Sequence, residues 1–85
     1  MKLDQLRVLD GIVTQGSFRK AAEVLHKSQP ALSQAIKNLE EEAGLCLLSR
    51  DSYRPELTPA GRAFYRQARA VLDQMQALKA LANRL

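Results

Sequence analysis

The last third of the chain predicts one long helix, which leaves only a small domain before it. Between Pro59 and Leu85 there is no further proline, and the only glycine is Gly61. Thr58 can cap the start of this helix, and a proline is tolerated at the first helical position. At roughly 1.5 Å per residue the helix would be about 40 Å long. Residues 1–58 can cover only its first turns, because a domain of about 60 residues has a radius of gyration of about 10 Å.

Apolar residues repeat along this helix with the period of a helix that pairs with another helix. One line recurs every seven residues: Phe64, Val71, Leu78 and Leu85. A second line stands three residues earlier each time: Gly61, Ala68, Met75 and Ala82. Without a partner, apolar side chains beyond the first turns would face water: Val71, Leu72, Met75, Leu78, Leu81 and Leu85. We therefore expect a homodimer whose interface is formed by Phe64, Ala68, Val71, Met75, Leu78, Ala82 and Leu85.

Three shorter helices are expected before it, because apolar residues recur there at spacings of three and four. The first has Gly16 as its stop and one apolar face, formed by Leu3, Leu6, Leu9 and Val13. The second is capped by Ser17, ends near His26 and carries Phe18, Ala21, Ala22 and Leu25. The third is capped by Ser28, has Pro30 in its first turn, stops at Gly44 and carries Leu32, Ile36, Leu39 and Ala43.

A small two-stranded hairpin is expected between the third helix and the long one. The apolar run Leu45 to Leu48 is followed by a polar stretch, residues 49–56, and then by Leu57. Cys46 lies within the apolar run and is expected to be a small core residue, inert when buried. The fold class is therefore mainly α, with a three-helix core and a hairpin in residues 1–58, followed by a dimerisation helix in residues 59–85.

The second and third helices are joined by a tight turn at His26 to Gln29, which is the geometry of a helix-turn-helix. In that motif the later helix enters the major groove of DNA. The outer face of the third helix carries a polar row: Gln29, Ser33, Gln34 and Lys37. Glutamine can pair with adenine, and serine can pair with several bases. Any amphipathic helix has a polar outer face, so the row by itself is better explained as a solvated surface.

Charge is clustered along the chain. Residues 17–37 carry four cations and one carboxylate, and residues 50–69 carry five arginines and two carboxylates. Between them, Glu40 to Glu42 form an acidic block, which we interpret as a solvated helix face. Two basic segments favour a polyanionic partner, although chance clustering would look the same. The candidates for phosphate contacts are Ser17, Lys20, Lys27, Ser28, Lys37, Arg50, Arg54 and Arg62.

The chain resembles the N-terminal domain of LysR-type transcriptional regulators over nearly its whole length and in one register. The matching residues are Gly16, Ser17, Phe18, Ala21, Ala22, Leu25, Ser28 to Ser33, Ile36, Leu39, Glu40, Gly44, Leu47, Arg50, Leu57, Thr58, Ala60, Gly61 and Phe64. The resemblance implies a winged helix-turn-helix that binds double-stranded DNA as a dimer, or as a tetramer in a full-length form. It favours antiparallel pairing of the long helices, a point that the heptad alone does not decide.

The resemblance also implies roles for individual residues. The family's base- and phosphate-contacting positions match Ser28, Gln29, Pro30, Ser33, Gln34 and Lys37, and among these Gln29, Pro30, Ser33 and Gln34 are the base-reading candidates. Arg50 matches the arginine after the first wing strand, and Arg54 lies in the wing tip, where the family usually has basic residues. Cys46 and Leu48 stand where the family often has proline and phenylalanine, and the wing is more acidic than usual. Regulators of this type carry an effector-binding domain after the linker helix, so we expect either the DNA-binding part of a longer protein or a stand-alone domain.

Other classes of function find little support in the residues. His26 is the only histidine and Cys46 the only cysteine, so neither a catalytic site nor a metal site is expected, and we expect no cofactor and no small-molecule ligand for these residues. Neither a signal-peptide-like run nor a membrane-length apolar segment is present, so we expect no membrane contact and a cytoplasmic, nucleoid-associated bacterial protein. Two alternatives stay open: a helical protein–protein dimerisation module that has lost DNA binding, and a non-specific architectural DNA binder.

Overall fold

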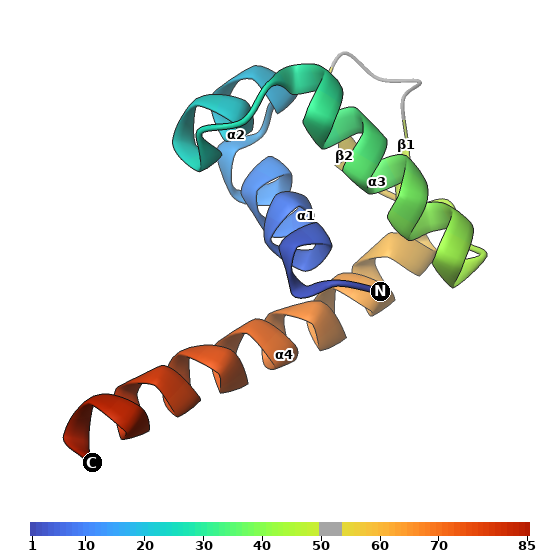
Figure 1. Ribbon diagram of the computed structural model, residues 1–85. Helices are drawn as coiled ribbons and strands as arrows, with labels where there is room; N and C mark the ends of the chain where they lie inside the picture. The colour runs from blue at the N-terminus through green and yellow to red at the C-terminus, as the bar shows by residue number, and fades with distance from the viewer. Residues whose placement is uncertain (50–53) are drawn as a thin grey trace.

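The computed structural model describes residues 1–49 and 54–85 (Figure 1). Its elements follow the expected order: α1 (Leu3–Gln15), α2 (Phe18–Leu25), α3 (Gln29–Ala43), β1 (Leu48–Ser49), β2 (Glu56–Leu57) and α4 (Pro59–Arg84). The predicted fold class, a three-helix core with a small wing and a long final helix, is confirmed. Arg50, a predicted DNA contact, lies outside the described residues.

The helices after α1 begin at the predicted capping residues. The Oγ of Ser17 accepts the N–H of Lys20 at 3.0 Å, and the Oγ of Ser28 accepts that of Ala31 at 3.2 Å. Each bond satisfies a backbone donor that the first turn of a helix leaves without an intrahelical partner. α1 ends at Gly16, whose φ of 76° lies in the left-handed region that glycine adopts without strain. The helix boundaries therefore follow from local sequence.

The core lies between α1, α2 and α3, which form the upper body of the molecule in Figure 1. α1 and α3 supply its largest side chains that are fully buried: Val8, Leu9, Ile12, Leu32, Ile36 and Leu39. α2 contributes mainly Ala21 and Ala22, whose small side chains let α1 and α3 pack close to it. This packing fixes α3 with one face inward and the opposite face free for a ligand.

The wing begins as a two-stranded antiparallel sheet in which Leu48 lies opposite Leu57. Leu47 and Leu48 are buried, but Leu45 and Cys46 are exposed, so the expectation that Cys46 is a core residue is wrong. The reason is that the strand starts only at Leu48, and the chain turns inward only at Leu47, after Leu45 and Cys46 have run along the surface. The thiol of Cys46 donates a hydrogen bond to the carbonyl oxygen of Leu48 at 3.5 Å.

Glu40 connects α3 to this wing. Its Oε2 accepts the backbone N–H groups of Leu47 at 2.7 Å and Leu48 at 3.3 Å. These donors are near a sheet edge and would otherwise be costly to bury without a partner. The interpretation of Glu40 as part of a solvated face is therefore wrong, whereas Glu41 and Glu42 are exposed as expected.

α4 joins the domain through a close backbone contact. The Thr58 hydroxyl accepts the N–H of Gly61 at 2.9 Å and donates to the carbonyl oxygen of Cys46 at 2.5 Å. A Cβ at Gly61 would lie 2.1 Å from the carbonyl oxygen of Leu47, so only glycine fits there without a shift. Further along, Ala68 and Leu72 are buried against the domain, which corrects the expectation that Leu72 faces water.

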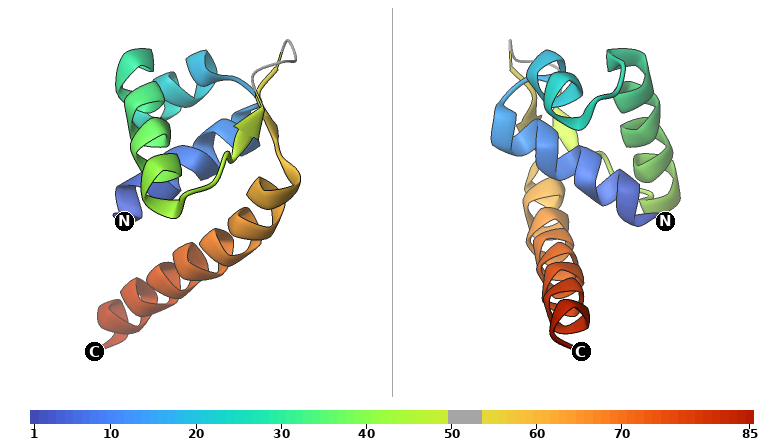
Figure 2. Two further views of the ribbon diagram at one scale, coloured as in Figure 1. Left: turned by 90° about the vertical axis from the view of Figure 1, so that its right-hand side faces the viewer. Right: turned by 60° about the vertical axis from the view of Figure 1, so that its left-hand side comes forward.

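Beyond Met75 the helix leaves the domain and projects as an arm, as both views in Figure 2 show. The molecule is accordingly elongated, with extents of 47 × 26 × 19 Å. None of the helices in the described part of the chain combines the length and apolar character needed to cross a membrane.

Candidate nucleic-acid interface

The outer face of α3 presents the predicted polar row. Leu32 and Ile36 anchor the helix with fully buried side chains, while Gln29, Gln34 and Lys37 are exposed and Ser33 is partly buried. The side-chain amide of Gln34 donates to the Oδ1 of Asn38 at 2.8 Å. Asn38 was not among the predicted site residues, because an asparagine late in a helix carries no signal that distinguishes it from a solvated residue.

The start of α3 is suited to an anion as well as to a base. Ser28 and Pro30 occupy the cap and the first turn, and both are exposed. The first turn of a helix directs backbone N–H groups and the positive end of the helix dipole outward. Amide side chains and a positive helix end therefore lie together at this corner of the molecule.

Three of the predicted phosphate contacts come together in one hollow. Ser17 and Lys20 from the start of α2 line it with Arg54, which precedes β2 in the wing, and Arg19 joins them. Arg19 also pairs with Glu23 at 2.9 Å. The fold thus brings the two basic segments of the sequence onto one surface, beside the wing.

The remaining phosphate candidates are placed apart from this hollow. Lys27 pairs with Asp4 of α1 at 3.3 Å, an exposed ion pair of the kind that contributes about 0–1 kcal/mol and can exchange partners. The Nη1 of Arg62 donates to the carbonyl oxygen of Leu57 at 3.3 Å, at the base of the wing. Lys37 is exposed on α3.

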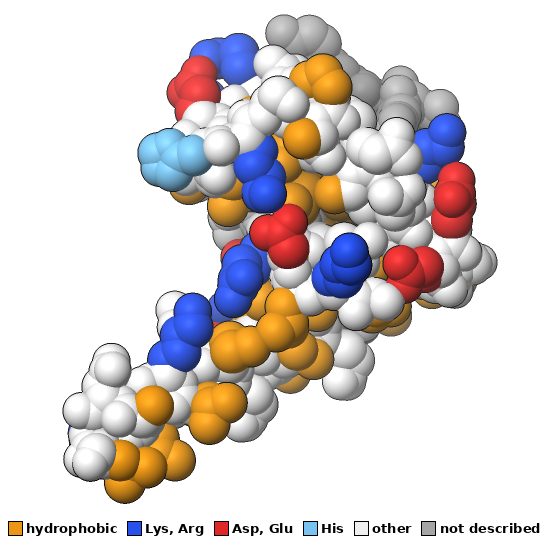
Figure 3. All heavy atoms as spheres, viewed as in Figure 1, with side chains coloured by type: hydrophobic (Ala, Val, Ile, Leu, Met, Phe, Trp, Pro, Cys, Tyr) orange, Lys and Arg blue, Asp and Glu red, His pale blue; other side chains and the backbone are white. Residues whose placement is uncertain are grey.

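The exposed apolar side chains of the heptad lie on the arm of α4 and just before it. Val71 is 45% exposed, Leu78 61% and Leu85 95%, and Leu81 beside them is 44% exposed. Figure 3 shows hydrophobic side chains gathered along this arm. Ala68, in contrast, is only 3% exposed within one chain, and Phe64 and Met75 are partly buried, so these three members of the predicted interface already pack on their own domain.

A polar cluster that the sequence did not predict links α1 to α4. The carboxylate of Asp10 accepts the Tyr65 hydroxyl at 2.6 Å through Oδ1 and pairs with the guanidinium of Arg69 at 2.9 Å through Oδ2. Arg69 also pairs with Asp73, one turn further along α4. We call Asp10, Tyr65 and Arg69 the joint cluster. Asp10 and Tyr65 are 55 residues apart in sequence, so no local pattern could reveal the contact.

The joint cluster perturbs the acidity of its phenol. Burial and then the hydrogen bond to Asp10 raise the pKa of Tyr65 from 10.0 to about 12. Because the folded-state pKa lies above the unfolded one, the stabilisation linked to this group is complete below pH 10 and is lost as the pH rises towards 12.

This shift predicts a measurable titration. The tyrosinate absorbance of the wild type minus that of Tyr65→Phe should show a midpoint near pH 12. The Phe variant keeps the ring but lacks the hydroxyl, so the difference isolates Tyr65 from Tyr53. A midpoint near the ordinary value of 10.0 would mean that the hydroxyl is neither buried nor bonded to Asp10 in solution.

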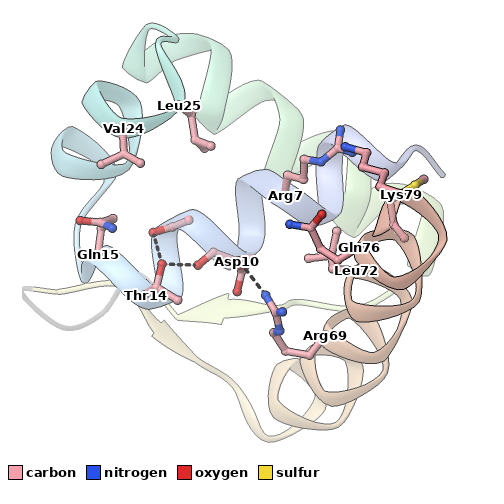
Figure 4. A pocket seen from close by; sticks show the side chains of 12 residues that line it. Arg7, Asp10, Thr14, Gln15, Val24, Leu25, Arg69, Leu72, Gln76 and Lys79 are labelled. Carbon is pink, nitrogen blue, oxygen red and sulfur yellow. Dashed lines mark hydrogen bonds and ion pairs between the residues drawn. The ribbon is translucent and has the colours of Figure 1, made fainter. Parts of the chain in front are cut away.

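The described residues contain no group of three or more His, Cys, Asp or Glu side chains that could hold a metal ion. A separate hollow of about 290 Å³ lies between α1, α2 and α4, next to the joint cluster (Figure 4). Its lining mixes the cations Arg7 and Lys79 with apolar Leu25 and Leu72. The predicted base-reading and phosphate-binding residues that the structure describes lie on α2, on α3, in the wing and at the start of α4.

Comparison with known proteins supports this assignment. The family model of bacterial regulatory helix-turn-helix proteins of the lysR family matches residues 3–62. The chain is 40% identical to the Hca operon transcriptional activator HcaR of Escherichia coli K12 and 40% identical to the regulator BenM of Acinetobacter baylyi, in each case over its full length. It spans 29% and 28% of the lengths of these two relatives.

Solved structures match equally well. The DNA-binding domain of BenM in complex with benA site 1 DNA superposes with a TM-score of 0.93 at 40% identity, over 99% of this chain and 94% of that one. The complex of the CbnR DNA-binding domain with DNA gives a TM-score of 0.89 at 32% identity, over 99% and 97% of the two chains.

Proposed function

The chain belongs to the LysR family of bacterial regulatory helix-turn-helix proteins, and from this premise we propose that it binds double-stranded DNA of a specific sequence, as a homodimer, to regulate transcription. The observation that carries the proposal is the outer face of α3. Exposed amides stand at the free start of a helix whose opposite face is anchored by fully buried side chains. A rigid helix with amides at its tip can be held against base edges in a major groove.

In this proposal the residues at the tip of α3 read bases. Gln29, Pro30, Ser33 and Gln34 face the major groove, and a glutamine amide can bond to the N6 and N7 positions of adenine. Phosphate contacts then fix the register of α3 on the duplex. They come from Ser17, Lys20 and Arg54 in the basic hollow, and from Lys27, Ser28, Lys37, Arg50 and Arg62 around it.

We propose further that residues 1–58 are the DNA-binding unit and that residues 59–85 join two copies. The exposed apolar side chains Val71, Leu78, Ala82 and Leu85, with Leu81 beside them, support a helix pair, and the partly buried Phe64 lies on the same heptad line. Two copies related by a twofold axis present two α3 helices, so the operator is an inverted repeat. Antiparallel pairing and a tetramer of a longer form follow the family resemblance. This role needs no cofactor, metal, membrane or enzymatic activity, and it places the protein on the nucleoid in the bacterial cytoplasm.

A selection experiment tests the proposal. Random-sequence duplexes are enriched on the purified protein, and the affinity of the protein for the enriched duplexes is then measured over a series of salt concentrations. We expect a consensus with twofold symmetry and an affinity well above that for random DNA. Binding without a consensus, lost with a salt slope of about 0.9 per phosphate contacted, would identify an architectural binder instead. A folded dimer that binds no duplex would indicate a protein–protein module.

A further inference from the structure

The angle between the domain and α4 decides where two copies can place their reading helices. α4 runs about 30 Å from Tyr65 to Leu85, at roughly 1.5 Å per residue. We call the contact between α4 and the domain the joint. A rotation of about 10° at the joint would therefore move the far end of the helix by about 5 Å. Successive phosphates on one DNA strand are separated by about 3.4 Å along the helix axis, so such a movement exceeds the rise of one base pair. A dimer joined through α4 can select one half-site spacing only if this joint is stiff.

The apolar part of the joint ends early. Gly61 packs against the backbone of Leu47, and Ala68 and Leu72 are the last side chains of α4 that are buried. The apolar contacts of Ala68 and Leu72 hold the helix on the domain, but they have no preferred direction and resist sliding and rotation less than directional bonds do.

Beyond the hydrogen bond from Thr58 to Cys46 at the start of α4, directional bonds to the domain are supplied by the joint cluster. Asp10 uses one carboxylate oxygen for Tyr65 and the other for Arg69, so a single side chain of α1 is bonded to two successive turns of α4. The Asp10 side chain is only 23% exposed, which keeps water from competing strongly for it. Figure 4 shows Asp10 pointing from α1 towards Arg69 on α4.

We propose that Asp10, Tyr65 and Arg69 are positioning residues that set the spacing of the two half-sites accepted by the dimer. They touch no base in this arrangement and act through the direction in which α4 leaves the domain. The inference rests on the proposed function, since it requires DNA binding by a dimer joined through α4. It adds a determinant of operator architecture that is separate from the base-reading residues of α3.

The test uses duplexes that carry two selected half-sites in inverted orientation, with the separation varied in steps of one base pair. The wild type should bind one separation about tenfold more tightly than separations changed by one or two base pairs. Tyr65→Phe and Asp10→Asn should flatten this profile: affinity at the best separation falls about fivefold, and affinity at the others changes less. Binding to a duplex with a single half-site should stay within about twofold of the wild type, because α3 is unchanged.

Controls separate positioning from stability. Asp73→Asn makes the same chemical change at an exposed carboxylate and leaves both bonds to Asp10 in place, so its profile should match that of the wild type. Each variant is checked for its melting temperature and for dimerisation by sedimentation. Should Asp10→Asn unfold, Tyr65→Phe still tests the joint, because the ring remains in its packed position.

The outcomes distinguish a failure of the spacing inference from a failure of the proposed function. If the variants keep the sharp profile of the wild type, the joint cluster does not set the spacing and the inference is wrong, while the proposed function stands. If the wild type itself shows no preference for two half-sites over one, the proposed dimeric function is wrong and the inference is overturned with it.

Discussion

A Val71→Asp, Leu78→Asp double variant should sediment as a monomer and should bind a two-half-site duplex about 100-fold more weakly than the wild type, or weaker still. Both side chains are exposed in the single chain, at 45% and 61%, so the substitutions leave the fold of each domain intact. In a helix pair they would bury four carboxylates in an apolar seam, which is strongly unfavourable without partners. The loss of affinity follows because the second half-site is no longer bound by a linked domain.

The matched control for this variant places the same charges elsewhere on α4. Ala70→Asp, Ala80→Asp changes two exposed positions outside both heptad lines and should remain dimeric. If the control loses DNA affinity as strongly as the Val71, Leu78 variant, the effect is repulsion between the new carboxylates and phosphates. If the Val71, Leu78 variant remains a dimer, the heptad is not the interface.

Gly61→Ala should destabilise the domain by about 2–3 kcal/mol, the cost typical of overpacking. The new Cβ would lie 2.1 Å from the carbonyl oxygen of Leu47. Leu47 directly precedes β1, so its backbone oxygen cannot move without distorting the chain there. The better helix propensity of alanine, worth about 1 kcal/mol, offsets only part of this cost. The midpoint of thermal unfolding should fall by roughly 4–8 °C per kcal/mol, measured at one protein concentration because the dimer is linked to stability.

Gly11→Ala is the matched control for this substitution. A Cβ at Gly11 would lie 2.9 Å from the Cδ1 of Leu25, which is the end of a flexible side chain. Leu25 can rotate, so this variant should stay within about 1 kcal/mol of the wild type. Equal stability of Gly61→Ala and Gly11→Ala would show that α4 does not approach Leu47 as closely in solution.

Local sequence signals predicted most of this fold because its elements are set by caps and apolar periods. Ser17, Ser28 and Thr58 mark helix starts through bonds to residues three positions away, which sequence spacing displays directly. The inward stripe of α3 follows for the same reason. The polar face on the opposite side of α3 follows too, so the base-reading candidates could be predicted from the sequence alone.

The sequence did not reveal contacts that depend on tertiary distance. Asp10 contributed only a charge to the sequence pattern, yet it bonds to two residues of α4. From the sequence Glu40 was interpreted as one of three solvated carboxylates, yet it accepts hydrogen bonds from the backbone N–H groups of Leu47 and Leu48. The burial of Leu72 and the exposure of Cys46 were predicted wrongly, because periodicity does not give the exact turn at which a helix leaves a domain or a strand begins.

The central claim is that the tip of α3 reads bases, and paired binding titrations of Gln29→Ala test it most directly. The variant and the wild type are measured on the selected duplex and on random-sequence duplexes at the same salt concentration. We expect the variant to lose about 1–3 kcal/mol on the selected duplex and to be nearly unchanged on random DNA. Lys20→Ala, which removes a phosphate contact, should instead weaken binding to both duplexes alike and lower the salt slope by about 0.9. An equal loss on both duplexes for Gln29→Ala would contradict base reading by α3.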